Sequence, residues 1–269
     1  AVSATIGPII PPSVPFILYG ALTSTSVGKL FMGGVIPGVL LGFWLMAVVA
    51  WLAHRGRISS SRYTRGRARF GNVVTAVRRS FWALMTPVIL IGGMNTGWFT
   101  ATESAGIAVV YAILVVRFVY RAVTFREIFA MFCESAEYVG VIMIVVAAAS
   151  VFGWLVIQAG AADVFLDVIR SAKQGPMTTL VILNLVLLVM GMFVEATSMI
   201  ILLSPILVPL IKETGIDPVH FGVVFTLNIM IATITPPVGI CGLIASDIAG
   251  VSMQRFSREV IPYVVAMVA

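Results

Sequence analysis

Charged residues are scarce in this sequence, since Asp, Glu, Lys and Arg make up only 10% of its 269 residues. Soluble globular domains carry about 25% charged residues, and disordered chains are poor in apolar ones, so the composition excludes both classes. The two cysteines, Cys133 and Cys241, lie far apart without the spacing of a metal site or of a secreted disulfide scaffold, and we expect both to be reduced. The composition therefore indicates an integral membrane protein.

Long stretches contain no charge at all, and they also lack the alternation of apolar and polar residues that membrane β-barrels require. The segments Val35 to Ala53 and Val139 to Ile157 are continuous apolar runs of this kind. A membrane-spanning helix needs about 20 such residues. The fold class predicted is thus an all-α integral membrane protein.

No acidic residue occurs between His54 and Ser80, although this segment, residues 54–80, is rich in arginine. Its eight arginines are Arg55, Arg57, Arg62, Arg65, Arg67, Arg69, Arg78 and Arg79. Nucleic acid or anionic lipid could bind such a run, but a short arginine-rich loop between apolar spans is usually the positive-inside signal. We therefore predict a basic cytoplasmic loop and no nucleic-acid partner.

Further apolar segments divide the chain into expected spans. They are Ser13 to Thr23, Phe81 to Phe99, Ser104 to Val116 and Met177 to Val194, with a polar connector at Ser24 to Gly34 and an amphipathic piece at Arg117 to Tyr138. The amphipathic piece either lies along the interface or extends its neighbours. Because Ala269 follows Pro262 too closely for a full span, and the start resembles the interior of a protein, we expect a part of a longer chain.

The last third of the sequence has interrupted segments instead of clean spans. Pro205 and Pro209 interrupt Ala196 to Ile211, and "TITPPVG" separates Val219 to Ile234 from Ile240 to Ile248. Such breaks at membrane depth leave backbone groups unpaired, which is tolerated only inside protein or beside a water-filled cavity. The pattern indicates a transporter.

Local signals predict where some helices begin. Asp217 before Pro218 is typical of an N-cap followed by proline in the first turn. Thr100 and Glu103 have the spacing of a capping box, which favours a structural role for Glu103 over a functional one.

An internal repeat relates residues 5–40 to residues 230–265 at an offset of 225. Pro11 and Pro12 then align with Pro236 and Pro237, and Pro37 aligns with Pro262. Both copies are expected to contain a polar segment, two prolines, a short apolar helix, a polar connector and a span that starts at proline. Broken helices that recur in two halves of a transporter mark its binding site.

The two double-proline breaks supply oxygen ligands and free helix ends. Carbonyls released by proline, together with hydroxyl groups, suit a hard cation such as sodium, and a helix N-terminus suits a carboxylate. The expected donors are Ser3, Thr5 and Ser13 at the first break and Thr233 and Thr235 at the second. The alternative is that each hydroxyl simply bonds a carbonyl of its own helix.

Glu195 is the remaining candidate, because it lies between two apolar runs and is followed by Thr197 and Ser198. An ionisable group at membrane depth is a functional hypothesis by default. The alternative role is that of an acid at a helix N-terminus, and the two roles are compatible.

Three stretches carry a resemblance to a known family: "GPIIPPS" at residues 7–13, "GIDPVHFG" at 215–222 and "TPPVG" at 235–239, with "FTATESAGIAVVYA" between the first two. In that order they resemble the large (DctM-like) membrane subunit of tripartite ATP-independent periplasmic (TRAP) transporters. The resemblance covers residues 1–269 as a single, partial permease region. Family members are longer at the front, which again suggests that the first hairpin is incomplete here.

The resemblance implies an inverted-repeat, elevator-type carrier with broken helices and re-entrant hairpins, in the bacterial inner (cytoplasmic) membrane. Residues 1–34 would be the first broken-helix element, and residues 195–259 the second hairpin and its broken helix. The implied binding residues include the hydroxyl groups named above and Glu195, which matches the family pattern G-x-F-x-[DE]. The others are Gly7, Pro11, Pro12, Thr197, Ser198, Pro236, Pro237 and Gly239.

The family also implies partners and an energy source. A small (DctQ-like) membrane subunit and a periplasmic (DctP-like) binding protein would work with this chain, sodium would be the coupling ion, and the substrate would be an organic acid such as a C4-dicarboxylate or sialic acid. A stand-alone carrier, antiporter or channel stays open as an alternative. An enzyme is disfavoured, because the sequence has neither an HExxH pair nor a nucleophile with a base, and ATP use is disfavoured because there is no phosphate-binding loop.

Overall fold

The structure is a computed structural model that describes residues 2–55, 70–158, 175–236 and 239–268. All regular elements in these ranges are helices, as the sequence predicts. The chain divides into two compact units, Ala1–Val48 with Ile142–Ala269 (unit 1) and Val49–Val141 (unit 2). Most of the predicted basic loop, the connector after residue 158, and Pro237 lie outside the described residues.

Unit 2 is built around a helical hairpin of α3 (Phe70–Asn95) and α4 (Ala101–Leu114). Tyr111 Oη donates to the carbonyl of Trp82 at 2.9 Å, and Tyr120 Oη donates to the carbonyl of Arg79 at 2.9 Å. These two bonds tie the last part of the α4 segment to the first half of α3. The basic segment 54–80 is partly helical, because α3 already begins at Phe70.

The capping box predicted at the start of α4 is confirmed. Thr100 Oγ1 accepts from Glu103 N at 3.3 Å, and Glu103 Oε2 accepts from Thr100 N at 2.8 Å. The expected span Phe81 to Phe99 runs past the end of this helix, since α3 ends at Asn95 and Gly97, with a φ of 72°, lies in the turn before α4.

The amphipathic segment 117–138 extends its neighbours and does not form a separate surface helix. Its first residues complete η2 (Val115–Val119), a π-helical turn that continues α4. The chain reverses at Arg121, which has a φ of 51°, and α5 (Phe125–Gln158) begins directly afterwards. A second capping box, which the sequence reading missed, starts this helix, because Glu127 Oε2 accepts from Thr124 N at 2.6 Å and Thr124 Oγ1 accepts from Glu127 N at 3.3 Å.

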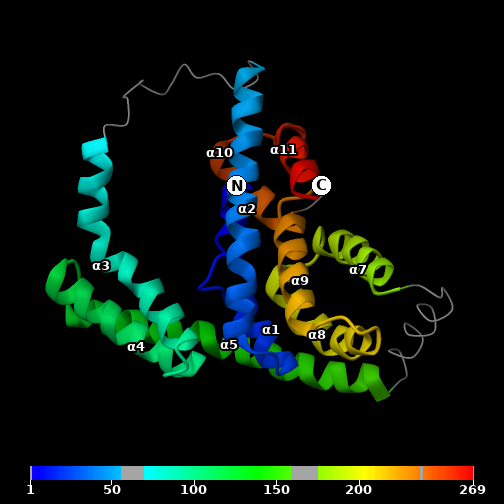
Figure 1. Ribbon diagram of the computed structural model, residues 1–269, viewed down its shortest axis with the longest axis horizontal. Helices are drawn as coiled ribbons and strands as arrows, with labels where there is room; N and C mark the ends of the chain where they lie inside the picture. Colours follow the sequence, from blue (N-terminus) through cyan, green and yellow to red (C-terminus); the bar gives the residue numbers. More distant parts are fainter. Residues whose placement is uncertain (1, 56–69, 159–174, 237–238, 269) are drawn as a thin grey trace. The chain divides into compact units, whose positions relative to one another are not determined.

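Unit 1 packs around α9 (Pro218–Ala232), whose residues are mostly buried (Figure 1). Its other elements are the 3-10 helix η1 (Val2–Ile6), α1 (Val14–Thr23), most of α2 (Val27–His54), α7 (Pro176–Gly191), α8 (Ala196–Glu213), α10 (Ile240–Ala249) and α11 (Met253–Val268). Helices α1, α7, α8 and α11, together with η1, all contact α9. Asp217 caps α9 as predicted, accepting from the amides of Val219 and His220 at 2.9 Å.

Glycine lets α1, α2 and α9 approach closely. A Cβ atom at Gly222 would lie 2.5 Å from Tyr19 Cε1 and 2.8 Å from Leu30 Cδ2. The Tyr19 ring is fully buried there, and its hydroxyl donates to the carbonyl of Pro218 at 2.9 Å. The helix after the first double proline is thereby fixed against the start of α9.

One predicted boundary is wrong. The connector expected at Ser24 to Gly34 is only Ser24–Ser26, because α2 begins at Val27 and its glycines serve close packing. The interruption predicted at Pro205 is confirmed, because α8 bends by 51° there, between Ala196–Ser204 and Ile206–Glu213.

The two copies of the internal repeat have the same order of elements. The short helices α1 and α10 both end at a left-handed residue, Ser24 with φ 55° and Gly250 with φ 63°, and a longer helix follows each. The aligned prolines, Pro37 and Pro262, lie inside α2 and α11, and the expectation that they start these helices is wrong.

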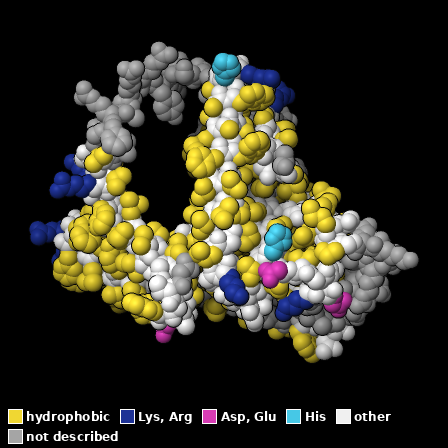
Figure 2. Space-filling model, viewed as in Figure 1, with side chains coloured by type: hydrophobic (Ala, Val, Ile, Leu, Met, Phe, Trp, Pro, Cys, Tyr) yellow, Lys and Arg dark blue, Asp and Glu magenta, His cyan; other side chains and the backbone are white. Residues whose placement is uncertain are grey.

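By length and composition, four helical stretches of the described chain are able to cross a membrane, or five if the bent α8 pair counts as one span. The four are Val27–His54, Val74–Met94, Ala101–Val119 and Phe125–Ala148. Figure 2 shows hydrophobic side chains over much of the visible face, as expected for surfaces that meet lipid. The chain is a multi-pass membrane protein.

Replacing Gly222 with alanine is expected to lower the melting temperature of the purified protein, because overpacking a closely packed contact costs about 1–3 kcal/mol. The measurement is thermal unfolding in detergent. Gly140→Ala is the matched control, since Gly140 is also helical and nothing lies within 4 Å of its added Cβ. Equal melting temperatures for the two variants would contradict the close contact.

Candidate functional site

The first double-proline break connects η1 to α1 and is held by its own hydroxyl groups. Ser13 is buried and caps α1, with its Oγ accepting from Phe16 N at 3.3 Å and donating to the carbonyl of Pro8. Thr5, also buried, donates to the carbonyl of Val2 at 2.7 Å. Pro11 is buried, whereas Ser3, Gly7 and Pro12 are exposed.

The second break follows α9 and has the same kind of internal bonding. Thr233 Oγ1 donates to the carbonyl of Met230, and Thr235 Oγ1 donates to the carbonyl of Ile231, each at 2.7 Å. Both threonines are buried, and Pro236 is half-buried. The alternative prediction is therefore correct in that each hydroxyl donates its proton to a carbonyl of α9. Their oxygen lone pairs can still accept a bond or coordinate a cation.

Carbonyl oxygens converge on Gly239 at this break. A Cβ atom there would lie 2.8 Å from the carbonyl oxygen of Thr235 and 2.9 Å from that of Thr233. Gly239 has a φ of 34°, a conformation that side chains disfavour, and it is buried. Glycine is thus required at this position both by its backbone conformation and by the two oxygens beside it.

Glu195 caps α8 with both carboxylate oxygens. Oε1 accepts from Thr197 N and Oε2 accepts from Ser198 N, each at 2.9 Å. The structural role foreseen for Glu195 is therefore present. Thr197 and Ser198, which the resemblance implied as binding residues, contribute backbone amides to this contact.

The turn that carries Glu195 lies beside the second break. Gly239 N donates to the carbonyl of Met192 at 3.1 Å, and a Cβ atom at Gly191 would lie 2.5 Å from the Cβ atom of Ala232. The C-terminal ends of α7 and α9 therefore touch, at the points where the chain leaves each helix. This contact brings the Glu195 turn and the "TITPPVG" segment together.

Helix η1 of the first copy approaches the same end of α9. Val2 packs against the buried cluster of Ile231, Ile234, Val260 and Val264. Thr5 Oγ1 lies 3.9 Å from Met267 Sδ, at the edge of this cluster. Three sequence-distant candidates, η1, the Glu195 turn and the second break, are thus gathered around one helix end, whereas Ser13 contacts Pro8 and Phe16.

Sequence analysis missed an asparagine pair one to two turns before the second break. Asn228 Nδ2 in α9 donates to the carbonyl of Asn184 at 2.8 Å and to Asn184 Oδ1 at 2.7 Å, and so joins α9 to α7. Asn228 is 8% exposed, and its Oδ1 has no hydrogen-bond partner among the described residues. The available signal was a polar amide in each of two apolar helices.

Three further buried hydroxyls in the described chain lack a partner, Ser104 in α4, Ser204 in α8 and Thr226 in α9. No group of three His, Cys, Asp or Glu side chains gathers within the described ranges in the way that a transition metal requires. The available ligands at the breaks are carbonyl, hydroxyl and carboxylate oxygens, which suit a hard cation.

Comparison with known proteins identifies the family. A model of the DctM component of the tripartite ATP-independent periplasmic transporter matches residues 1–269. The 2,3-diketo-L-gulonate TRAP transporter large permease protein YiaN of Escherichia coli is 36% identical over 97% of this chain and 61% of its own length. The sialic acid TRAP transporter large permease protein SiaM of Vibrio cholerae is 35% identical over 99% of this chain and 62% of its own length.

A third relative, the isethionate TRAP transporter permease protein DctMQ of Oleidesulfovibrio alaskensis, is 35% identical over 100% of this chain and 42% of its own length. The chain therefore spans less than two thirds of these relatives. They are transporter permeases and not enzymes, in agreement with the sequence analysis. This chain belongs to the DctM family of TRAP transporter large permeases.

Proposed function

We propose that this chain is the translocating part of a sodium-coupled importer of organic acids that receives its substrate from a periplasmic binding protein in the inner membrane of a bacterium. The relatives' names support an organic-acid substrate, since they specify diketogulonate, sialic acid, isethionate and C4-dicarboxylate. All are small organic anions. The elevator-type, inverted-repeat architecture is part of this proposal.

The observation that carries the proposal is the group of oxygens at the second break. Carbonyls of Thr233 and Thr235 face Gly239, and both threonine hydroxyls keep lone pairs available for a cation. We infer that sodium binds here. A second ion near Ser3, Thr5 and Ser13 follows from the repeat, although Ser3 is exposed and Ser13 is committed to capping α1.

Glu195 gives a physical route from sodium to substrate. Its carboxylate holds the amides of Thr197 and Ser198, which are the donors that a substrate carboxylate would use at the start of α8. Sodium beside the adjacent break would attract Glu195 and release these amides. The substrate would then bind well only after sodium, which is the differential affinity that coupling requires.

Partners are proposed on the same basis. The name of the isethionate relative, DctMQ, joins two component designations in one protein that is longer than this chain. This supports association with a small DctQ-like membrane subunit. A DctP-like periplasmic protein would deliver the substrate.

Uptake of radiolabelled organic acids into proteoliposomes tests the function. The complete transporter with its small subunit is expected to accumulate substrate only when both a sodium gradient and the binding protein are present. Uptake that is indifferent to the binding protein would instead identify a stand-alone carrier. Uptake is expected to saturate as the substrate concentration rises, as it does for a carrier. In a channel, the flux would continue to rise with substrate concentration.

Replacing Gly239 with alanine is expected to raise the sodium concentration for half-maximal uptake by tenfold or more, because the methyl group would push apart the carbonyls of Thr233 and Thr235. Gly250→Ala is the matched control. Gly250 also has a positive φ, 63°, but nothing lies within 4 Å of its added Cβ. If both variants shift the sodium dependence equally, backbone strain and not the oxygen group explains the effect.

Replacing Glu195 with glutamine is expected to reduce uptake at least tenfold and to weaken its dependence on sodium, because an amide retains a capping oxygen but carries no charge for the ion. Glu103→Gln removes a charge from another helix cap and is expected to leave the sodium dependence unchanged. Normal uptake with normal sodium dependence in Glu195→Gln would rule out the coupling role.

A further inference from the structure

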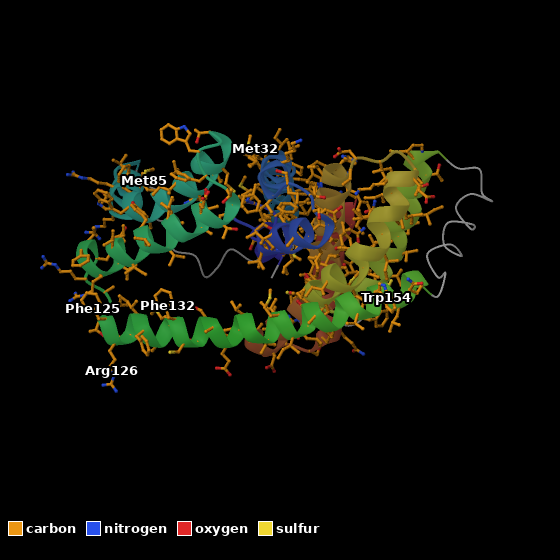
Figure 3. All side chains as sticks on the ribbon, turned by 90° about the horizontal axis from the view of Figure 1, so that it is seen from below. Met32, Met85, Phe125, Arg126, Phe132 and Trp154 are labelled. Carbon is orange, nitrogen blue, oxygen red and sulfur yellow. The ribbon has the colours of Figure 1, made fainter. Side chains whose placement is uncertain are left out.

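Unit 2 contains an apolar groove that the transport proposal does not use. It lies between the end of α4 and the start of α5, and its volume is about 260 Å³. Val109 and Ile113 of α4 face Ile128 and Phe132 of α5 across it, and Val116 lies at the end nearest the chain reversal. Figure 3 shows Phe132 on the side of α5 toward α4. The groove is thus a slot between two helices of one unit.

Two arginines, Arg117 and Arg121, lie at the end of this slot where the chain reverses. Arg117 directly follows the lining residue Val116, and its Nε is buried without a hydrogen-bond partner among the described residues. Its guanidinium carbon lies 4.9 Å from the centre of the Phe125 ring, which holds the group at this end of the groove. Arg121 follows in the reversal itself and is exposed.

The nearest acidic residue in the sequence, Glu127, does not form an ion pair with these arginines in the described structure. Glu127, which follows in the first turn of α5, directs Oε2 to the amide and the hydroxyl of Thr124 at 2.6 and 2.9 Å. The structure therefore presents a cation with an unused donor beside an apolar slot. An anion with an apolar tail is the complementary ligand.

We propose that this groove binds an anionic phospholipid, with one acyl chain in the slot and the phosphate on Arg117 and Arg121. The lipid would come from the cytoplasmic leaflet, because the arginine-rich segment indicates that this end of unit 2 lies on the cytoplasmic side of the membrane. The bond from Tyr120 to the carbonyl of Arg79 places this end of the α4 segment beside the first half of α3, where Arg78 and Arg79 belong to the arginine-rich segment. Positive residues mark the cytoplasmic side, where anionic headgroups are available.

The chemistry of the groove favours an anionic lipid. From Val109 to Val116 the groove runs roughly 10 Å along α4, at 1.5 Å per residue. Its lining is apolar, and an arginine with a donor unpaired among the described residues lies at one end, so an acyl chain with an anionic headgroup complements both features.

Native mass spectrometry of the intact complex tests the proposal, with phosphatidylglycerol, phosphatidylcholine of the same chains, and inorganic phosphate as probes. Phosphatidylglycerol is expected to bind at least fivefold more tightly than phosphatidylcholine, since one arginine near the surface contributes about that factor. Arg117→Gln should remove most of this preference, with the remainder contributed by Arg121, and Arg117→Lys should restore part of it. Inorganic phosphate alone should not bind.

Arg126→Gln is the matched control, because Arg126 lies at the same end of α5 but points away from α4 (Figure 3). It should keep the full preference for phosphatidylglycerol. Ala112→Trp fills the groove without changing charge and should weaken binding of both lipids about tenfold. Equal binding of the two lipids to the unmodified complex, equal effects of Arg117→Gln and Arg126→Gln, or unchanged binding in Ala112→Trp would each overturn the proposal.

Discussion

Backbone hydrogen bonding in an apolar environment is the constraint on which this structure depends. A helix that stops at membrane depth leaves amides and carbonyls without partners, and lipid cannot supply any. Hydrogen bonds from neighbouring side chains or from a distant backbone amide therefore close the breaks. Ser13 bonds the first turn of α1, Glu195 bonds that of α8, and Gly239 donates across to Met192. These contacts allow short and bent helices to persist among the spans.

The same contacts order the candidate site and occupy groups that the proposed ligands would use. A donor or acceptor that closes a break is also the group that a ligand would use, so binding has to exchange one partner for another. Glu195 illustrates this, because its carboxylate already occupies the amides suited to a substrate carboxylate. The hydroxyl oxygens of Thr233 and Thr235 keep their lone pairs, since both hydroxyls act as donors to their own helix, whereas the carbonyl of Thr233 also accepts from Cys241 N at 3.1 Å.

Helix α9 contacts elements of both copies of the repeat. Its start holds Tyr19 of the first copy through the carbonyl of Pro218, and its end meets η1, α7 and α11. Glycine at position 222 permits the first contact, and the small pair of Gly191 and Ala232 permits the approach of α7. The buried bond between Asn184 and Asn228 adds a polar link within the same bundle. Small and polar residues of this kind commonly join membrane helices, because apolar side chains alone gain little over lipid.

By itself the sequence determined the membrane class, the helical content, the caps at Thr100 and Asp217, and the positions of the breaks. These features depend on composition or on residues within a few positions of each other, so a local reading suffices. Only the tertiary structure decided that the Glu195 turn touches the second break, that Asn228 bonds Asn184, and that α2 begins at Val27. Such outcomes depend on packing between sequence-distant helices, where one missing Cβ atom decides whether two backbones can meet.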